Sequence, residues 1–182
     1  MKLQETLDLE RGIWKATKKQ GVFGCFEVTI GWFGKERVDY MTYDTKGIWR
    51  CFEIKVSKSD FRSKAHNTFI GHFNYYVMPR KLYEQVEKEI PDGIGVYVGG
   101  ACVKKPKKRE LGVDEQVLKD SMIRSLSRDV DKQIKSEDKH LVDALNREIG
   151  RYRREKEDWY KKYWRLLRKV EEKFGVDWER EK

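Results

Sequence analysis

Three charged side chains between residues 37 and 56 interrupt apolar stretches and have the types that phosphate chemistry needs. Asp39 lies in the stretch RVDYM (37–41), and Glu53 and Lys55 lie in CFEIKV (51–56). Successive side chains of a strand point to opposite faces, so Glu53 and Lys55 share one face and their apolar neighbours occupy the other. Two acids and a lysine on one sheet face could hold a divalent cation beside an ammonium group. This arrangement is typical of enzymes that cleave phosphodiester bonds.

The surroundings of Glu53 and Lys55 distinguish this pair from other acid-x-lysine triplets. In a chain with 39% charged residues, the same pattern recurs at residues 44–46, 137–139 and 171–173. Those triplets lie in a turn ending with glycine or in charge-rich helical sequence. Only residues 53–55 interrupt a run of strand-forming residues, where an unpaired charge is expensive to bury. The competing interpretation is a half-buried strand whose charged side faces water.

The residues after Lys55 predict a helix that begins beside the candidate site. Ser57 and Asp60 have the spacing of a capping box, with Ser57 as the N-cap. The expected helix runs from Lys58 to about Ile70. Three basic residues at its start could hold phosphates, namely Lys58, Arg62 and Lys64.

Three segments of the chain resemble the PD-(D/E)XK nuclease superfamily, and within it the MmcB-like DNA-repair proteins and their phage relatives. These segments are VD (38–39), FEIKVSKSDF (52–61) and HFNYYVMP (72–79). The resemblance covers about residues 9–98 and departs at Val38, where the superfamily name has proline. It implies an α/β fold with a restriction-endonuclease-like αβββαβ core and a mixed central sheet. It also implies hydrolysis of DNA in repair, recombination or phage DNA processing, with Mg²⁺ as cofactor and Mn²⁺ as a substitute.

The resemblance also implies roles for individual residues. Asp39, Glu53 and the Ile54 carbonyl would be metal ligands, because Mg²⁺ prefers oxygen donors. Lys55 would orient or deprotonate the attacking water, or balance charge in the transition state, and these roles stay open. A third acid is either Glu27, on the strand before Asp39, or Glu10, on the first helix; Glu27 is favoured. The alternative function is a catalytically silent DNA-binding or recruiting protein with the same fold.

Hydrophobic periodicity predicts helices interleaved with short strands, which is typical of a mixed sheet covered on both faces. The expected helices before residue 103 are 7–19, 58–70 and 80–89. The expected strands are 25–30, 37–43, 49–56, 74–78 and 94–98.

The chain divides by composition into a nuclease-like domain (1–103), a basic linker (104–112) and a helical region (113–182). The linker could contact a nucleic-acid backbone or be solvated, and its basic residues are Lys104, Lys105, Lys107, Lys108 and Arg109.

The helical region has a coiled-coil seam whose members alternate steps of four and three residues. They are Leu145, Ile149, Tyr152, Lys156, Trp159, Tyr163, Leu166 and Val170. Such a face has to be buried against another helix. We expect a homodimer through this region; the alternative is an antiparallel return onto a helix at residues 118–134.

Charge and cysteine content are consistent with a protein that binds DNA in the cytoplasm. The 182 residues carry a formal net charge of +9, which favours an anionic partner. The three cysteines lack metal-ligand spacing, and their odd number argues against a disulfide framework. No apolar stretch has the length of a membrane span, so no membrane association is expected.

Overall fold

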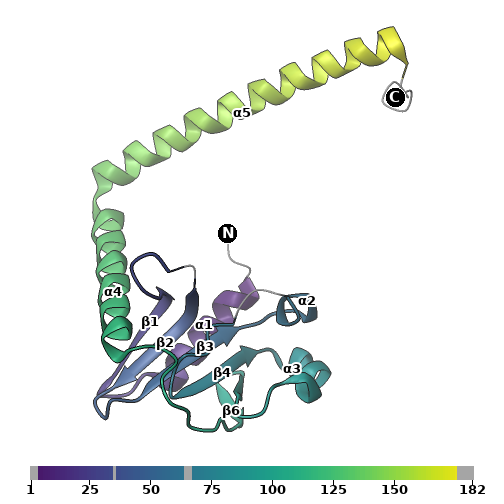
Figure 1. Cartoon of the computed structure of the whole chain (residues 1–182). Coiled ribbons are helices and arrows are strands. Elements are labelled where there is room, and N and C mark those ends of the chain that lie inside the picture. The colour runs from purple at the N-terminus through teal and green to yellow at the C-terminus, as the bar shows by residue number, and fades with distance from the viewer. Residues whose placement is uncertain (1–3, 35, 64–66, 176–182) are drawn as a thin grey trace. The chain divides into compact units, whose positions relative to one another are not determined.

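The structure is a computed structural model that describes residues 4–34, 36–63 and 67–175. Short helices are interleaved with strands over the first hundred residues, and two long helices follow (Figure 1). In chain order the elements are α1 (Gln4–Thr17), β1 (Val22–Thr29), β2 (Arg37–Asp44), β3 (Trp49–Ile54), α2 (Lys58–Phe61), β4 (Phe73–Met78), α3 (Arg80–Val86), the 3₁₀ helix η1 (Glu87–Glu89), β5 (Gly95–Val98), β6 (Ala101–Lys104), α4 (Glu115–Glu137) and α5 (Lys139–Phe174).

The strands form one mixed sheet in the order β1-β2-β3-β4-β5-β6. The pairs β1–β2, β2–β3 and β5–β6 are antiparallel, while β3–β4 and β4–β5 are parallel. The expected α/β class with a mixed sheet is confirmed, as are the five predicted strands. The sixth strand, β6, was not predicted, because Ala101–Lys104 is short and almost entirely exposed.

Both faces of the sheet are covered, as the alternation of apolar side chains requires. On one face, Leu9 and Ile13 of α1 pack against a cluster that includes Phe52 and Ile54 of β3. On the other face, α3 covers β4 and β5, and its buried Leu82 is a member of the cluster there.

The first half of α4 completes the second face over β1, β2 and β3. Leu118 and Met122 are buried in a cluster with Trp49 and Cys51. The Trp49 indole nitrogen donates to Glu115 Oε1 at 3.1 Å, which fixes the start of α4 on the sheet.

The compact units of the chain are residues 1–129 and 130–182, so the boundary differs from the expected one near residue 104. The physical reason is that the apolar side of α4 supplies part of the core of the first unit.

The segment at residues 104–112 is tied to the first unit and is not a free linker, which corrects the sequence interpretation. Its backbone N–H groups of Lys107, Arg109 and Gly112 donate to the carbonyls of Gly93, His72 and Ile70 at 2.9–3.0 Å. These three bonds hold the segment against the turn before β5 and the residues that lead into β4.

The helix predicted at residues 58–70 is much shorter in the structure, where α2 ends at Phe61. Its start is as expected: Ser57 Oγ accepts from the Asp60 N–H at 3.1 Å. The backbone leaves the helix after Phe61, and the Thr68 N–H donates to Glu53 Oε1 at 3.2 Å. A helix through Thr68 would have bound that N–H to the carbonyl four residues earlier.

The second unit contains the end of α4 and the whole of α5, which confirms the expected helical region. Asp138 is the N-cap of α5 and accepts from the Leu141 N–H at 3.1 Å. Gly175 follows α5 with φ of 84°, a left-handed conformation that glycine adopts readily. No helix within the described residues is both long and apolar enough to cross a membrane.

Leu118→Ala should destabilise the first unit, because it removes a fully buried side chain between α4 and the sheet. We expect a loss of about 3 kcal/mol in the free energy of unfolding. The measurement is urea unfolding followed by near-ultraviolet circular dichroism. Val130→Ala, on the exposed part of the same helix, is the matched control and should change stability by less than about 0.5 kcal/mol. Equal effects of the two substitutions would contradict the docking of α4.

Candidate active site

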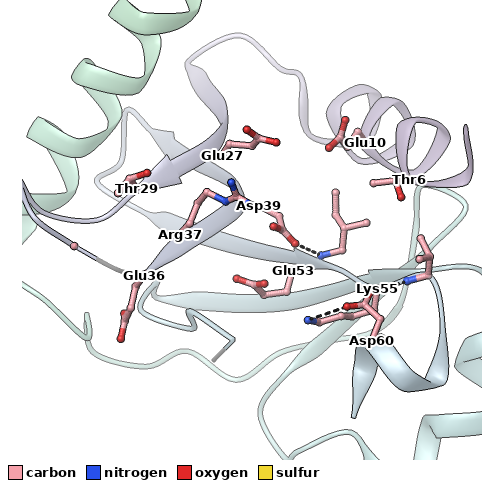
Figure 2. Close-up of a pocket in the computed structure, with 13 residues that line it drawn as sticks. Thr6, Glu10, Glu27, Thr29, Glu36, Arg37, Asp39, Glu53, Lys55 and Asp60 are labelled. Carbon is pink, nitrogen blue, oxygen red and sulfur yellow. Dashed lines mark hydrogen bonds and ion pairs between the residues drawn. The ribbon is translucent and has the colours of Figure 1, made fainter. Parts of the chain in front are cut away.

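A cavity of about 810 Å³ lies where α1, β1, β2, β3 and the start of α2 meet (Figure 2). Of the described residues in its walls, six have acidic and two have basic side chains. The residues that line it are Thr6, Glu10, Glu27, Thr29, Gly34, Glu36, Arg37, Asp39, Glu53, Ile54, Lys55, Val56 and Asp60. Asp39, Glu53 and Lys55, predicted as one site, therefore share one cavity, and so do both candidates for a third acid.

Three of the acids form a row across neighbouring strands. In the β1–β2 register, Phe26 pairs with Tyr40 and Val28 with Val38, so Glu27 falls opposite Asp39. In the β2–β3 register, Tyr40 pairs with Phe52, and the next position places Asp39 opposite Glu53. The two registers thus place Glu27, Asp39 and Glu53 at neighbouring positions on adjacent strands, and all three residues line the cavity.

The backbone at Glu27 has a left-handed conformation, with φ of 52°. Cys25 and Val28 pack in the same apolar cluster, although a regular strand would place residues three apart on opposite faces. The left-handed residue between them interrupts the alternation of β1. Arg128 of α4 donates to the Glu27 carbonyl at 3.0 Å and supports this conformation.

Burial dominates the electrostatics of the two central acids. The side chain of Glu53 is only 4% exposed, and burial together with the charge of Asp39 raises the pKa of Glu53 to about 8. Burial also raises the pKa of Asp39, although the Ile54 N–H donates to Asp39 Oδ2 at 2.8 Å and opposes the rise. Without a cation, the pair therefore tends to keep a proton that isolated carboxyl groups would lose.

Lys55 is held at the wall of the cavity by the residues that begin α2. Its side chain is 6% exposed, and its Nζ lies 3.9 Å from Asp60 Oδ1. The other oxygen of Asp60 accepts from the Val56 N–H at 3.3 Å. Figure 2 shows Lys55 and Asp60 side by side, with Glu53 on the adjacent part of the cavity wall. Asp60, which belongs to the capping box of α2, thus also positions Lys55.

The donor set suits a hard cation with few protein ligands. The described residues contain no group of three or more His, Cys, Asp and Glu side chains placed to hold a metal ion. Asp39 and Glu53 nevertheless present two carboxyl groups to one cavity, and Mg²⁺ is usually bound through one or two carboxylates, with waters and phosphates completing its shell. The residues present therefore fit Mg²⁺ better than a metal that requires a complete protein cage.

Of the basic residues predicted to contact nucleic acid, those that the structure describes lie outside the cavity lining. Arg62 makes a bidentate ion pair with Glu89, at 2.6 and 2.8 Å. Lys58 is exposed at the start of α2, and Lys64 lies outside the described residues.

Three of the five basic residues at 104–109 bind within the fold. Lys104 Nζ donates to the Ile90 carbonyl, Lys107 pairs with Asp92 at 2.6 Å, and Arg109 donates to the Asp92 carbonyl. Lys105 and Lys108 are exposed. These contacts stabilise the turn before β5, so the segment has a structural role whether or not it contacts DNA.

Sequence reasoning missed Arg37, Glu36 and Asp60 as cavity residues. The position of Arg37, two residues before Asp39 on the predicted strand, was a usable signal because such residues share a face. Asp60 was identified only as a capping residue. His72, which is not in the cavity lining, accepts from the Trp49 N–H at 3.1 Å through Nδ1 and helps to fix β3.

Comparisons with known proteins bear on the fold and not on the chemistry. No protein family and no curated protein matches the sequence. Among solved structures, the chain is similar to SPO1766, a protein of unknown function from Silicibacter pomeroyi. The TM-score is 0.56 at 17% identity, and the match covers 75% of this chain and 92% of that chain. At this identity the likeness shows a shared fold alone.

Glu53→Gln should remove a pH dependence of stability. The folded chain keeps the Glu53 proton up to a pKa of about 8, whereas the ordinary value is 4.5. Between these values the unfolded chain binds fewer protons, so wild-type stability falls as the pH rises. Glutamine cannot ionise, and the variant should exceed wild type by roughly 2 to 4 kcal/mol at pH 8.5 and by much less near pH 5. The measurement is thermal unfolding in EDTA across this range. The control is Glu36→Gln, at an exposed glutamate of the same cavity. If the Glu53→Gln variant lost stability with rising pH as steeply as wild type, Glu53 would not be the group with the raised pKa.

Glu27→Gly and Glu27→Ala should differ in stability, although both remove the same carboxylate. Glycine tolerates a left-handed backbone, while alanine retains a steric cost of about 1 kcal/mol there. We expect the glycine variant to be the more stable of the two by about this amount in urea unfolding. An alanine variant as stable as the glycine variant would show that residue 27 is not left-handed in solution.

Proposed function

We propose that this protein is a metal-dependent DNA nuclease of the PD-(D/E)XK type, acting in DNA repair, recombination or phage DNA processing. The observation that carries the proposal is the meeting of Asp39, Glu53 and Lys55 in one cavity at the junction of β2, β3 and α2. The order α1-β1-β2-β3-α2-β4 is consistent with the restriction-endonuclease-like core that this proposal includes.

The charge of the cavity supports a cation as part of the site. Among the lining residues that the structure describes, six carry carboxyl groups and two carry basic groups, and carboxylates in this excess would repel a phosphodiester. Burial is the main cause of the raised pKa values of Asp39 and Glu53, and in each case a neighbouring carboxyl group adds to the rise. Strong perturbation of neighbouring acids in a cavity is a common property of functional sites. Asp39 and Glu53 would hold Mg²⁺, or Mn²⁺ as a substitute, with the Ile54 carbonyl as a further oxygen.

In the proposed reaction, the cation and the residues of the chain have different roles. A bound divalent cation would promote ionisation of the attacking water and neutralise phosphate oxygens. Lys55 would place positive charge beside the phosphoryl group, where negative charge builds up during the reaction. Asp60 would keep the Lys55 ammonium group at the cavity wall. Arg37, on the other side of Asp39, could hold a neighbouring phosphate.

The row of acids favours Glu27 as the third acid, because it lies opposite Asp39 in the sheet and keeps a costly backbone conformation. Glu10 reaches the same cavity from α1 (Figure 2). Glu27→Gln should therefore lower cleavage more than Glu10→Gln does.

The alternative is a catalytically silent protein that binds or recruits DNA through the same fold. Lys55 argues for the enzyme, because a binding surface gains little from a lysine that is 6% exposed inside an acidic cavity. DNA would reach either kind of site along exposed basic residues such as Lys58.

Cleavage of nicked, branched, single-stranded and duplex DNA in Mg²⁺ or Mn²⁺ tests the proposal. Asp39→Asn, Glu53→Gln and Lys55→Met should each lower the rate at least about a hundredfold, since each removes a ligand or a charge at the reacting phosphate. EDTA should abolish cleavage by the wild type. Calorimetry should show that only the substitutions at residues 39 and 53 weaken binding of Mn²⁺.

Lys46→Met is the matched control, because Lys46 ends an acid-x-lysine triplet that lies outside the candidate cavity. This variant should cleave at the wild-type rate. Metal and DNA binding without cleavage of any substrate would favour the silent alternative. Absence of metal binding would exclude both the proposed cofactor and the enzyme.

A further inference from the structure

The α5 helix carries an apolar stripe that the described structure leaves uncovered. None of the residues of α5 is buried. Leu145 and Ile149 are about half exposed, and Trp159 is 70% exposed. Large apolar side chains aligned on one helix face mark an interaction surface when no other element covers them.

The spacing of the stripe specifies another helix as its partner. Its eight positions alternate steps of four and three residues from Leu145 to Val170, and seven of them are apolar or aromatic. This period lets two helices keep contact over several turns by supercoiling around each other. The three aromatic seam residues of each copy, six in a pair, would bury roughly 1,000 Å² in total, which is about the lower limit for a specific interface, and the aliphatic seam residues would add to this area.

The one charged seam position, Lys156, discriminates between the two orientations of a pair. In a parallel pair in register, Lys156 faces Lys156 of the second copy, and two like charges meet in the seam. In an antiparallel pair that uses every seam position, the midpoint falls between Glu157 and Asp158, and Lys156 faces Trp159. An ammonium group over an indole ring is favourable. Lys156 already lies 5.6 Å from the ring centre of Tyr160 within its own helix, so it can approach an aromatic face.

The residues beside the seam favour the same orientation. In the antiparallel alignment, Glu148 lies beside Lys169 of the second copy, and Glu155 lies beside Lys162. Symmetry repeats each contact, so four pairs of opposite charge flank the seam. Arg153 meets Tyr160 on the other side of the seam, which adds a further cation–aromatic contact.

The parallel alignment places fewer opposite charges beside each other than the antiparallel alignment does. It offers Glu148 only Arg153 as an opposite charge and places Glu155 beside Tyr160 and Lys162 beside Leu167. Within one helix, Arg151 approaches Glu148 at 3.6 Å and Glu155 at 3.9 Å. These exposed contacts are long and weak, so they do not prevent the two glutamates from pairing across a dimer.

We propose that two copies of this chain associate through an antiparallel coiled coil of α5, with Leu145 of one copy against Val170 of the other. The two Asp138 residues, where the helices begin, then lie at opposite ends of the pair. The association does not depend on nuclease activity, so either proposal can fail without the other.

Charge exchange across the proposed interface tests the register in the full chain. Glu155→Lys and Lys162→Glu should each raise the dimer dissociation constant about tenfold, because each turns two attractive pairs into repulsive ones. The double variant restores opposite charges and should return the constant to within about twofold of wild type. The measurement is sedimentation equilibrium.

Glu157→Lys is the matched control, because it makes the same charge change at a position outside the seam and should leave the dissociation constant unchanged. A monomeric wild type at the highest soluble concentration would overturn the proposal. So would a double variant as weak as the two single variants combined.

Cysteine cross-linking tests the orientation separately. In a Cys102→Ser background, which removes the exposed cysteine, Ile149→Cys and Leu166→Cys proteins should form a disulfide-linked dimer on oxidation only when they are mixed. Linkage of either single variant to itself would indicate a parallel pair and overturn the antiparallel arrangement.

Discussion

The burial of two carboxyl groups on adjacent strands is the constraint on which the candidate site depends. Moving charge away from water is costly, and the cost rises when a second charge of the same sign lies beside the first. The fold offsets part of it with the Ile54 and Thr68 N–H groups, which donate to Asp39 and Glu53. Thr68 can do this only because the chain leaves the helix after Phe61. The remaining cost of burying the two charges falls when the pair retains a proton or binds a cation. The cavity around the pair has room for a cation.

The parts of the structure that follow from short-range patterns could be predicted from the sequence. A strand has a period of two residues, so Glu53 and Lys55 had to share a face wherever that strand was placed. The expected α/β class and five strands are confirmed for the same reason. The N-cap at Ser57 was also predictable, because the cap needs only a hydroxyl group three residues before a free N–H.

The remaining features depend on contacts between distant segments, which one sequence does not reveal. The row formed by Glu27, Asp39 and Glu53 requires the registers of two strand pairs, and the left-handed backbone of Glu27 has no residue-type signal. The Thr68–Glu53 hydrogen bond, which a helix through residue 70 would exclude, joins residues that are 15 positions apart in the sequence. The unit boundary depends on the docking of Leu118, because an amphipathic helix does not specify which apolar surface covers it.

The uneven distribution of charge imposes an order on the proposed reaction. The chain as a whole carries a formal net charge of +9, which would attract the proposed DNA substrate over a distance. Close to the site the sign is reversed, because acids outnumber bases in the cavity lining. Carboxylates and phosphate repel each other strongly at short range and low dielectric. A phosphodiester could therefore approach the buried Asp39–Glu53 pair only after, or together with, a cation that neutralises the two carboxylates. Attraction of DNA by the whole chain and repulsion of phosphate by the cavity would thus make binding at the site depend on the metal. Lys55 is buried in the cavity wall, so its charge would act only on a phosphate that has entered the cavity.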